Sequence, residues 1–176
     1  TNENEKISPQ YPYALSKYMG EQLVLHWAKV YKLKCNSIRI FNAYGLRSKT
    51  TGAYGSVIGT FMKQKIEKKP LTLVGDGRQK RDFINVKDLV KAFYLSAKSN
   101  FHSQVYNVGS GKPVSIKYLI KLIDSKTIKI PKRPGEPDIT HANISKIKRE
   151  LKWKPKISFD EGIKEIMQNI NYWKAA

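Results

Sequence analysis

A tyrosine and a lysine stand four residues apart near the start of the chain, as Tyr13 and Lys17 in the stretch YPYALSKYMGEQ. On a helix, residues with this spacing lie one turn apart on the same face. An ammonium group beside a phenol favours the phenolate and lowers the phenol's pKa from its ordinary value of about 10. Such a pair can transfer protons near neutral pH. The spacing alone equally fits two solvated residues of a lysine-rich helix.

The element that carries this pair is predicted to be a helix over residues 12–32, because apolar side chains recur there at helical spacing. We expect Tyr13 and Lys17 to lie away from the apolar face of this helix. The residues expected to form that buried face are Leu15, Met19, Leu23, Trp27 and Val30.

The remaining elements alternate between short strands and helices. Strands are predicted over 37–41, 71–74, 81–86, 104–108 and 127–130, and helices over 57–67, 86–98, 115–123, 143–151 and 159–173. In the helix over 86–98, the residues expected to point mostly inward are Leu89, Val90, Phe93, Leu95 and Ala97. This alternation is typical of an α/β fold. The G-x-G-x-x-G fingerprint of dinucleotide binding is absent from the sequence.

Composition limits the class of protein. The 176 residues amount to about one domain, and 40% of them are hydrophobic, so the chain can bury a core. No apolar run approaches the ~18 residues of a membrane-spanning helix, and we expect no membrane contact. The single Cys35 excludes an intrachain disulfide, and no Cys/His cluster has zinc spacing, so no metal is expected. A reducing, cytoplasmic setting is expected.

A net charge of +19 raises the alternative of a nucleic-acid or polyanion binder. The 33 basic residues are scattered along the chain, however, and only six of them are Arg, the residue best suited to bidentate phosphate contacts. No nucleic-acid recognition motif is present, so nucleic acid is an unlikely partner.

Five blocks in order carry a family resemblance: SPQYPYALSKYMGE, SIRIFNAYGLRS, VGDGRQKRDFINVKDLVKAF, VYNVGSGKPVSI and KRPGEPDITHANISKIKRELKWKPKISFDEGI. The chain resembles the extended short-chain dehydrogenase/reductases that act on nucleotide sugars. The resemblance implies the C-terminal part of a Rossmann-type doubly wound fold plus a smaller α/β substrate-binding domain. Residues 1–56 would end the NAD-binding domain, and residues 57–176 would mostly bind the nucleotide sugar. Residues 82–100 would return to the NAD-binding domain.

The resemblance matches only the C-terminal portion of such an enzyme. We therefore expect a fragment or part of a larger protein, inactive as an isolated chain because the Gly-rich cofactor turn is missing. An inactive fragment that only associates with a partner is a further alternative.

The resemblance also implies roles for residues around the cofactor. Tyr13 would be the general base that takes the proton from the sugar 4-hydroxyl. Lys17 would assist Tyr13 and hydrogen-bond the nicotinamide ribose of NAD. Phe41, Ala43 and Tyr44 would line the nicotinamide pocket.

For the substrate, Asn42 would hold the diphosphate or the sugar, and Arg81 would bind the diphosphate. Val74 would flank the base, Arg133 would be a second diphosphate arm, and Glu136 would accept from ribose hydroxyls. Asp82, next to Arg81, is expected to be structural.

The resemblance favours a 4-epimerase that removes hydride from sugar C4 and returns it to the opposite face. A 4,6-dehydratase, for which the upstream Asn2–Glu3 region would matter, or a decarboxylase is the alternative. A homodimer formed through the Tyr–Lys helix is expected.

Overall fold

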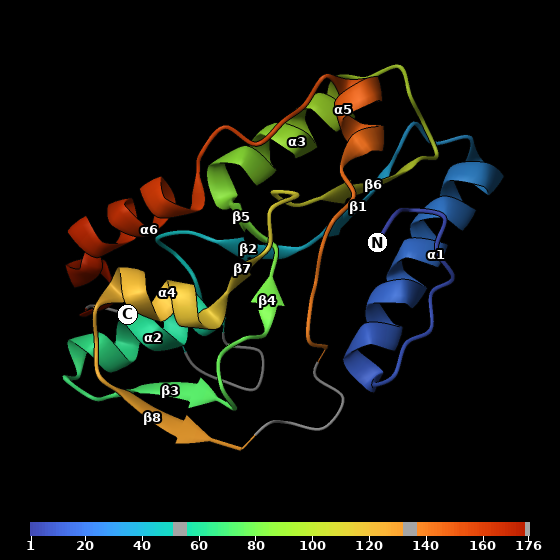
Figure 1. The fold of residues 1–176 in the computed structure, drawn as a ribbon. Coiled ribbons are helices and arrows are strands. Elements are labelled where there is room, and N and C mark those ends of the chain that lie inside the picture. Colours follow the sequence, from blue (N-terminus) through green and yellow to red (C-terminus); the bar gives the residue numbers. More distant parts are fainter. Residues whose placement is uncertain (51–55, 132–136, 175–176) are drawn as a thin grey trace.

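The computed structural model describes residues 1–50, 56–131 and 137–174 and confirms an α/β fold (Figure 1). The elements in chain order are α1 (Pro12–Tyr31), β1 (Ser37–Ile40), β2 (Asn42–Tyr44), α2 (Val57–Ile66), β3 (Leu71–Val74), β4 (Lys80–Arg81), β5 (Phe83–Asn85), α3 (Val86–Lys98), β6 (Val105–Val108), β7 (Val114–Ser115), α4 (Ile116–Ile123), β8 (Thr127–Ile130), α5 (Ser145–Leu151), α6 (Phe159–Gln168) and a 3₁₀ helix, η1 (Ile170–Lys174). Within the described ranges, no helix is long and apolar enough to cross a bilayer.

In the described part of the chain, the strands form four pairs. β1 pairs with β6, β2 with β5 and β3 with β8, all in parallel, and β4 pairs with β7 in antiparallel. β1 and β2 are one extended run that changes partner between Phe41 and Asn42. The Phe41 N–H donates to the carbonyl of Val108, the last residue of β6, and the Asn42 N–H donates to the carbonyl of Asp82, just before β5. Asn42 therefore lies where the chain passes from one strand pair to the next.

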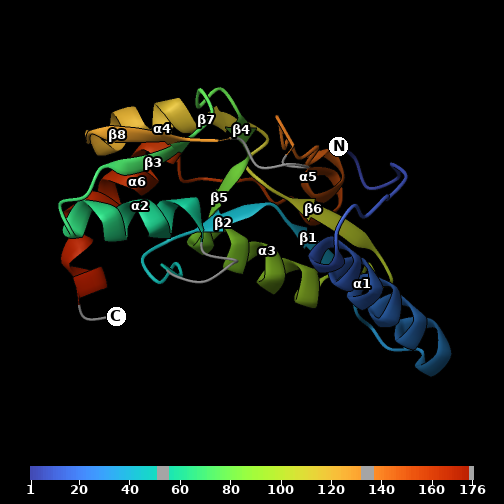
Figure 2. The same ribbon diagram turned by 90° about the horizontal axis from the view of Figure 1, so that it is seen from below.

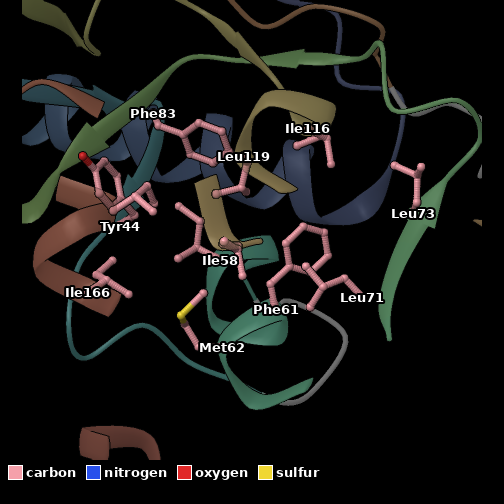
Figure 3. Close-up of a cluster of buried hydrophobic side chains, with 12 residues drawn as sticks. Tyr44, Ile58, Phe61, Met62, Leu71, Leu73, Phe83, Ile116, Leu119 and Ile166 are labelled. Atoms are coloured by element: carbon pink, nitrogen blue, oxygen red, sulfur yellow. The ribbon is translucent and has the colours of Figure 1, made fainter. Parts of the chain in front are cut away.

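Two hydrophobic cores lie on either side of β5. The side chains of the first converge between α2, α4, α6 and β3 (Figure 3), and those of the second lie between α3, α5 and β6. Phe83 belongs to the first core and Ile84 to the second, because successive side chains of a strand point to opposite faces. The views in Figures 1 and 2 agree that α1 lies at one end of the molecule and the β3–β8 pair near the other.

The start of α6 and the turn before it match the expectation that this region is structural. Ser158 forms a capping box with Glu161 at the start of α6. The buried Asp88 carboxylate accepts hydrogen bonds from the Lys156 and Ile157 N–H groups, at 2.9 Å each. Trp153 is buried and donates its indole N–H to the Asp88 carbonyl. α6 ends at Gln168, earlier than predicted.

The predicted buried face of α1 is wrong for this chain. Leu15, Met19, Leu23, Trp27 and Val30 are each between 47% and 58% exposed. The buried residues are instead Glu21 and Ala28, which lie two turns apart on the face that packs against β1. An ion pair, described below, holds this face of the helix against the sheet.

The inward face predicted for α3 is partly wrong as well. Leu89 is buried, but Val90 and Phe93 are 60% and 48% exposed, and Ala97 is also exposed. The other buried positions of the helix are Asp88, Ala92 and Ser96. The strand predicted over 81–86 is divided into β4 and β5 at Asp82.

The ion pair between Glu21 and Arg39 fixes α1 on β1. Arg39 donates through Nε and Nη2 to the two carboxylate oxygens of Glu21, at 2.7 and 2.8 Å. Its Nη1 donates to the Glu3 carbonyl at 3.0 Å. The hydrogen bond to Glu21 raises the pKa of Arg39 despite partial burial. A bidentate contact of this kind is both strong and specific in geometry.

We expect the Arg39→Met variant to lower the free energy of unfolding by about 3 kcal/mol, since it leaves the Glu21 carboxylate buried and unpaired. Urea denaturation measures this change. The double variant Arg39→Met/Glu21→Met should recover much of the loss, because it removes the unpaired charge.

The control for this prediction is Glu67→Gln, which removes an exposed pair with Lys69 and should leave the unfolding curve unchanged. A double variant as unstable as the single one would contradict the assignment of the cost to a buried charge.

Candidate active site

The structure places Tyr13 and Lys17 together on the first turns of α1, as the spacing predicts. The helix begins after Tyr11, with Pro12 at its first position, where a missing N–H costs no hydrogen bond. Tyr13 is 43% exposed, and the Lys17 ammonium nitrogen lies 5.2 Å from the centroid of the Tyr13 ring. An ammonium group over an aromatic face is held there by electrostatic attraction. The pair thus presents a phenol and an adjacent positive charge to a ligand.

The run from Phe41 to Tyr44 does not converge on one pocket. Phe41 packs against the α3–α5 core, whereas Tyr44 belongs to the α2–α4–α6 core. Ala43 between them is exposed. The side chain of Asn42 donates to the Asp82 carbonyl at 3.2 Å and to Thr140 Oγ1 at 3.1 Å. The cofactor role expected for Phe41, Ala43 and Tyr44 stays a prediction.

Tyr44 is a core residue in this structure. It is 3% exposed, and its ring meets the edges of Phe83 and Phe159 at centroid distances of 6.2 and 5.6 Å. Its hydroxyl lies against Gly162, where a Cβ atom would collide with it. Burial raises the pKa of Tyr44 to about 12. A cleft of about 410 Å³ opens beside it, bordered by residues 45–48 and by the ion pair of Lys87 with Glu165.

Arg81 and Val74 meet the same segment of chain, the one that follows β8. Arg81 is only 8% exposed, and its Nη1 donates to the carbonyls of Lys80 and Pro137 at 2.9 and 2.8 Å. Val74 lines a cleft of about 450 Å³ whose other wall includes Pro137, Asp138 and Ile139. In Figure 1 the segment leading from residue 137 to α5 runs between β4 and α1. Two predicted substrate residues thus lie beside this segment.

Arg133 and Glu136 lie outside the described residues, and their predicted roles stay predictions. Among the residues that the structure describes, no group of three or more His, Cys, Asp or Glu side chains could hold a metal ion.

Asp82 has hydrogen-bond partners that its local sequence does not predict. This residue is 0% exposed, and its carboxylate accepts hydrogen bonds from the Ser110 N–H and hydroxyl and from the N–H groups of Gly111 and Ala142. The expectation that Asp82 is structural is confirmed. Its partners lie 28 to 60 residues away along the chain, so no local pattern could identify them. Thr140 was missed for the same reason, because it lies 98 residues from Asn42.

Comparison with known proteins identifies the family. A family model described as GDP-mannose 4,6 dehydratase matches residues 1–166. The chain belongs to this family. A putative UDP-glucose 4-epimerase of Methanocaldococcus jannaschii is 33% identical to it over 94% of this chain and 55% of that protein. The family therefore includes members named for different reactions.

Solved structures show the same fold. The UDP-glucose 4-epimerase of Thermotoga maritima, crystallised with UDP-glucose, is 29% identical with a TM-score of 0.89, over 99% of this chain and 57% of that one. The UDP-glucuronic acid 4-epimerase of Bacillus cereus, in complex with UDP-glucuronic acid and NAD, is 29% identical with a TM-score of 0.83, over 97% and 56%. The chain thus spans about half the length of the relatives it matches.

The buried tyrosine predicts an alkaline loss of stability. Because the folded-state pKa of Tyr44, about 12, exceeds the unfolded value of about 10, its contribution is complete below pH 10 and is lost as the pH rises through 12. We expect Tyr44→Phe to reduce the fall in the free energy of unfolding between pH 10 and 12, measured by urea denaturation. Part of the fall should remain, since burial also raises the pKa of Tyr106.

The same two proteins compared at pH 7 serve as the control. The Tyr44 hydroxyl forms no well-aligned hydrogen bond among the described residues and has only a contact with the Asn85 side chain, so the variant should lose little stability there. An unchanged slope above pH 10 would contradict the prediction.

Proposed function

We propose that the protein containing this chain is an NAD-dependent nucleotide-sugar 4-epimerase. The observation that carries the proposal is the Tyr13–Lys17 pair, a phenol that is 43% exposed with an ammonium group over its ring. The similarity to the two 4-epimerases of known structure supports the same reaction class.

In this reaction Tyr13 acts as the general base. It accepts the proton of the sugar 4-hydroxyl as the carbonyl forms at C4, and it returns a proton when the carbonyl is reduced. The positive charge of Lys17 stabilises the phenolate form of Tyr13, which exists before the first step and again after the second, whereas Tyr13 holds the proton between them. The 4-keto sugar rotates in the site between the two steps. Reduction then occurs on the opposite face of the sugar and gives the epimer.

The residues of α1 fit the nicotinamide end of NAD, because an accessible ammonium donor and a phenol lie one helical turn apart. Lys17 would hydrogen-bond the nicotinamide ribose, and Tyr13 would face the reacting carbon of the sugar. The chemistry that NAD supplies when bound is acceptance of hydride from sugar C4 and its return to the opposite face. The chain itself would position Tyr13 and supply the positive charge of Lys17.

For the nucleotide sugar, we propose that Val74 flanks the base and that Arg81 contributes to diphosphate binding from beside the 137–139 segment. Arg133 and Glu136 would contact the second phosphate and the ribose. On this proposal, residues 1–56 and 82–100 belong with the NAD-binding domain. Because residues 105–108 and 142–153 contribute to the same core as α3, we group them with these segments. The rest of residues 57–176 would mostly bind the nucleotide sugar.

The N-terminal residues favour epimerisation over 4,6-dehydration. Elimination of water needs a general acid beside the leaving hydroxyl. Asn2 is an amide, and the Glu3 carboxylate accepts the Asn107 N–H of β6 at 2.9 Å. Asn2 cannot act as an acid, and one oxygen of the Glu3 carboxylate is already bound to the β6 backbone.

The half-exposed apolar face of α1, described above, is proposed to pair with a second copy of the chain.

We expect Tyr13→Phe in the full-length protein to lower kcat for UDP-sugar epimerisation about 100- to 10,000-fold, the range for loss of general acid–base catalysis. Sugar binding should change little, because the ring remains. Coupled assay of the epimer with added NAD measures kcat, and NMR identifies the product.

The matched control is Tyr11→Phe, which removes another exposed tyrosine hydroxyl just before the helix and should leave kcat unchanged. A Tyr13→Phe protein with full activity would refute the role of Tyr13. A 4-keto-6-deoxy product or release of carbon dioxide would replace the epimerase with a dehydratase or a decarboxylase.

A further inference from the structure

The hydrogen bonds of Asn42 determine which atom of its side chain a ligand can meet. One amide N–H donates to the Asp82 carbonyl at 3.2 Å and the other to Thr140 Oγ1 at 3.1 Å. A carbonyl oxygen only accepts, so it fixes the amide with Nδ2 toward Asp82 and Oδ1 on the other side. Both donors of the amide are therefore used within the protein.

The acceptor of the same amide is left for a ligand. Among the described residues, Oδ1 of Asn42 accepts no hydrogen bond. In the described chain, the buried side-chain atoms that lack a hydrogen-bond partner are Tyr44 Oη and Asn107 Oδ1. Asn42 Oδ1 is not one of them, so this unpaired oxygen is not buried. An unpaired polar atom that is not buried is open to a ligand.

Thr140 is held in place from two sides. On one side, the Lys80 N–H donates to the Asp138 carbonyl at 2.8 Å, and the Lys80 carbonyl accepts the Thr140 N–H at 3.1 Å. On the other side, the Asp82 N–H donates to Thr140 Oγ1 at 3.2 Å. The hydroxyl oxygen thus accepts from both Asp82 and Asn42, and its position follows that of the backbone around it.

The buried Asp82 carboxylate holds this backbone. It accepts the Ala142 N–H, two residues beyond Thr140, at 2.9 Å and the Gly111 N–H at 3.0 Å. Gly109 makes room for it, because a Cβ atom there would lie 3.0 Å from both carboxylate oxygens. A fully buried carboxylate is tolerated only when such donors surround it. Loss of one donor or of the charge would loosen the segment that carries Thr140.

We propose that Asp82 and Thr140 are positioning residues that lock the Asn42 amide with its N–H groups turned inward, so that Asn42 offers Oδ1 and selects a hydroxyl donor of the sugar. The inference rests on the proposed function and names the chemistry that this part of the site recognises. Phosphate oxygens are acceptors, so an Asn42 held in this way does not bind the diphosphate.

The first test compares two substitutions of Thr140 in the full-length protein. The readout is the dissociation constant of UDP divided by that of UDP-glucose, both measured calorimetrically. This ratio isolates the contribution of the sugar to binding. Thr140→Val removes the acceptor for the Asn42 amide and should reduce this ratio about tenfold, the effect of one lost hydrogen bond. Thr140→Ser keeps the hydroxyl and should preserve the ratio within about twofold.

The second test identifies the direction of the hydrogen bond. UDP-glucose analogues carry hydrogen or fluorine in place of one sugar hydroxyl at a time. Fluorine is not a hydrogen-bond donor, so at the hydroxyl bound by Asn42 both analogues should bind about tenfold more weakly. A fluoro analogue that binds as well as the parent sugar at every position would overturn the proposal.

The role of Asp82 is tested against Asp88, the other buried aspartate that accepts backbone N–H groups. Asp82→Asn should increase hydrogen exchange at the Ser110, Gly111 and Ala142 amides and lower the UDP to UDP-glucose ratio. Asp88→Asn should increase exchange at Lys156 and Ile157 and leave that ratio unchanged.

The outcomes separate the two proposals. Equal effects of the two aspartate variants on the ratio, or of Thr140→Ser and Thr140→Val, would overturn this inference while UDP-glucose still binds the parent protein. Failure of the parent protein to bind any UDP-sugar would instead refute the proposed function, and this inference with it.

Discussion

One buried carboxylate, that of Asp82, joins three segments that are far apart in the sequence. Its four donors come from the turn after β6 and from the segment before α5, and its own carbonyl accepts both the backbone and the side-chain N–H of Asn42. A charge that is 0% exposed is stable in a protein only when it is fully hydrogen-bonded. The order of the candidate site depends on this one cluster, since Asn42, Arg81 and Thr140 are all set by it or lie beside it.

A second charged contact decides how α1 lies. Helix burial usually follows the apolar stripe, yet here the polar Glu21 faces inward because Arg39 on β1 binds it through two hydrogen bonds. The large apolar side chains predicted to be buried are left outward, at about half exposure. The same orientation leaves Tyr13 and Lys17 exposed on the helix.

The candidate site lies where the two cores meet. β5 divides them, with Phe83 directed into one and Ile84 into the other. The chain passes from the β1–β6 pair to the β2–β5 pair at Phe41 and Asn42, and Asp82 lies at the same crossing. A ligand that contacts Asn42 and Arg81 would therefore lie at the junction between the two cores.

The sequence by itself determined the alternation of helices and strands, the helix starts near residues 115 and 159, the spacing of Tyr13 and Lys17, and the family. These features depend on residues within a few positions of each other, where helical spacing and capping act. The inward faces of α1 and α3, the core position of Tyr44 and the direction of the Asn42 amide were decided by the tertiary structure. Each depends on a partner from elsewhere in the chain, such as Arg39 for Glu21 or Thr140 for Asn42. Local sequence patterns do not predict such partners, because only folding brings them within hydrogen-bonding distance.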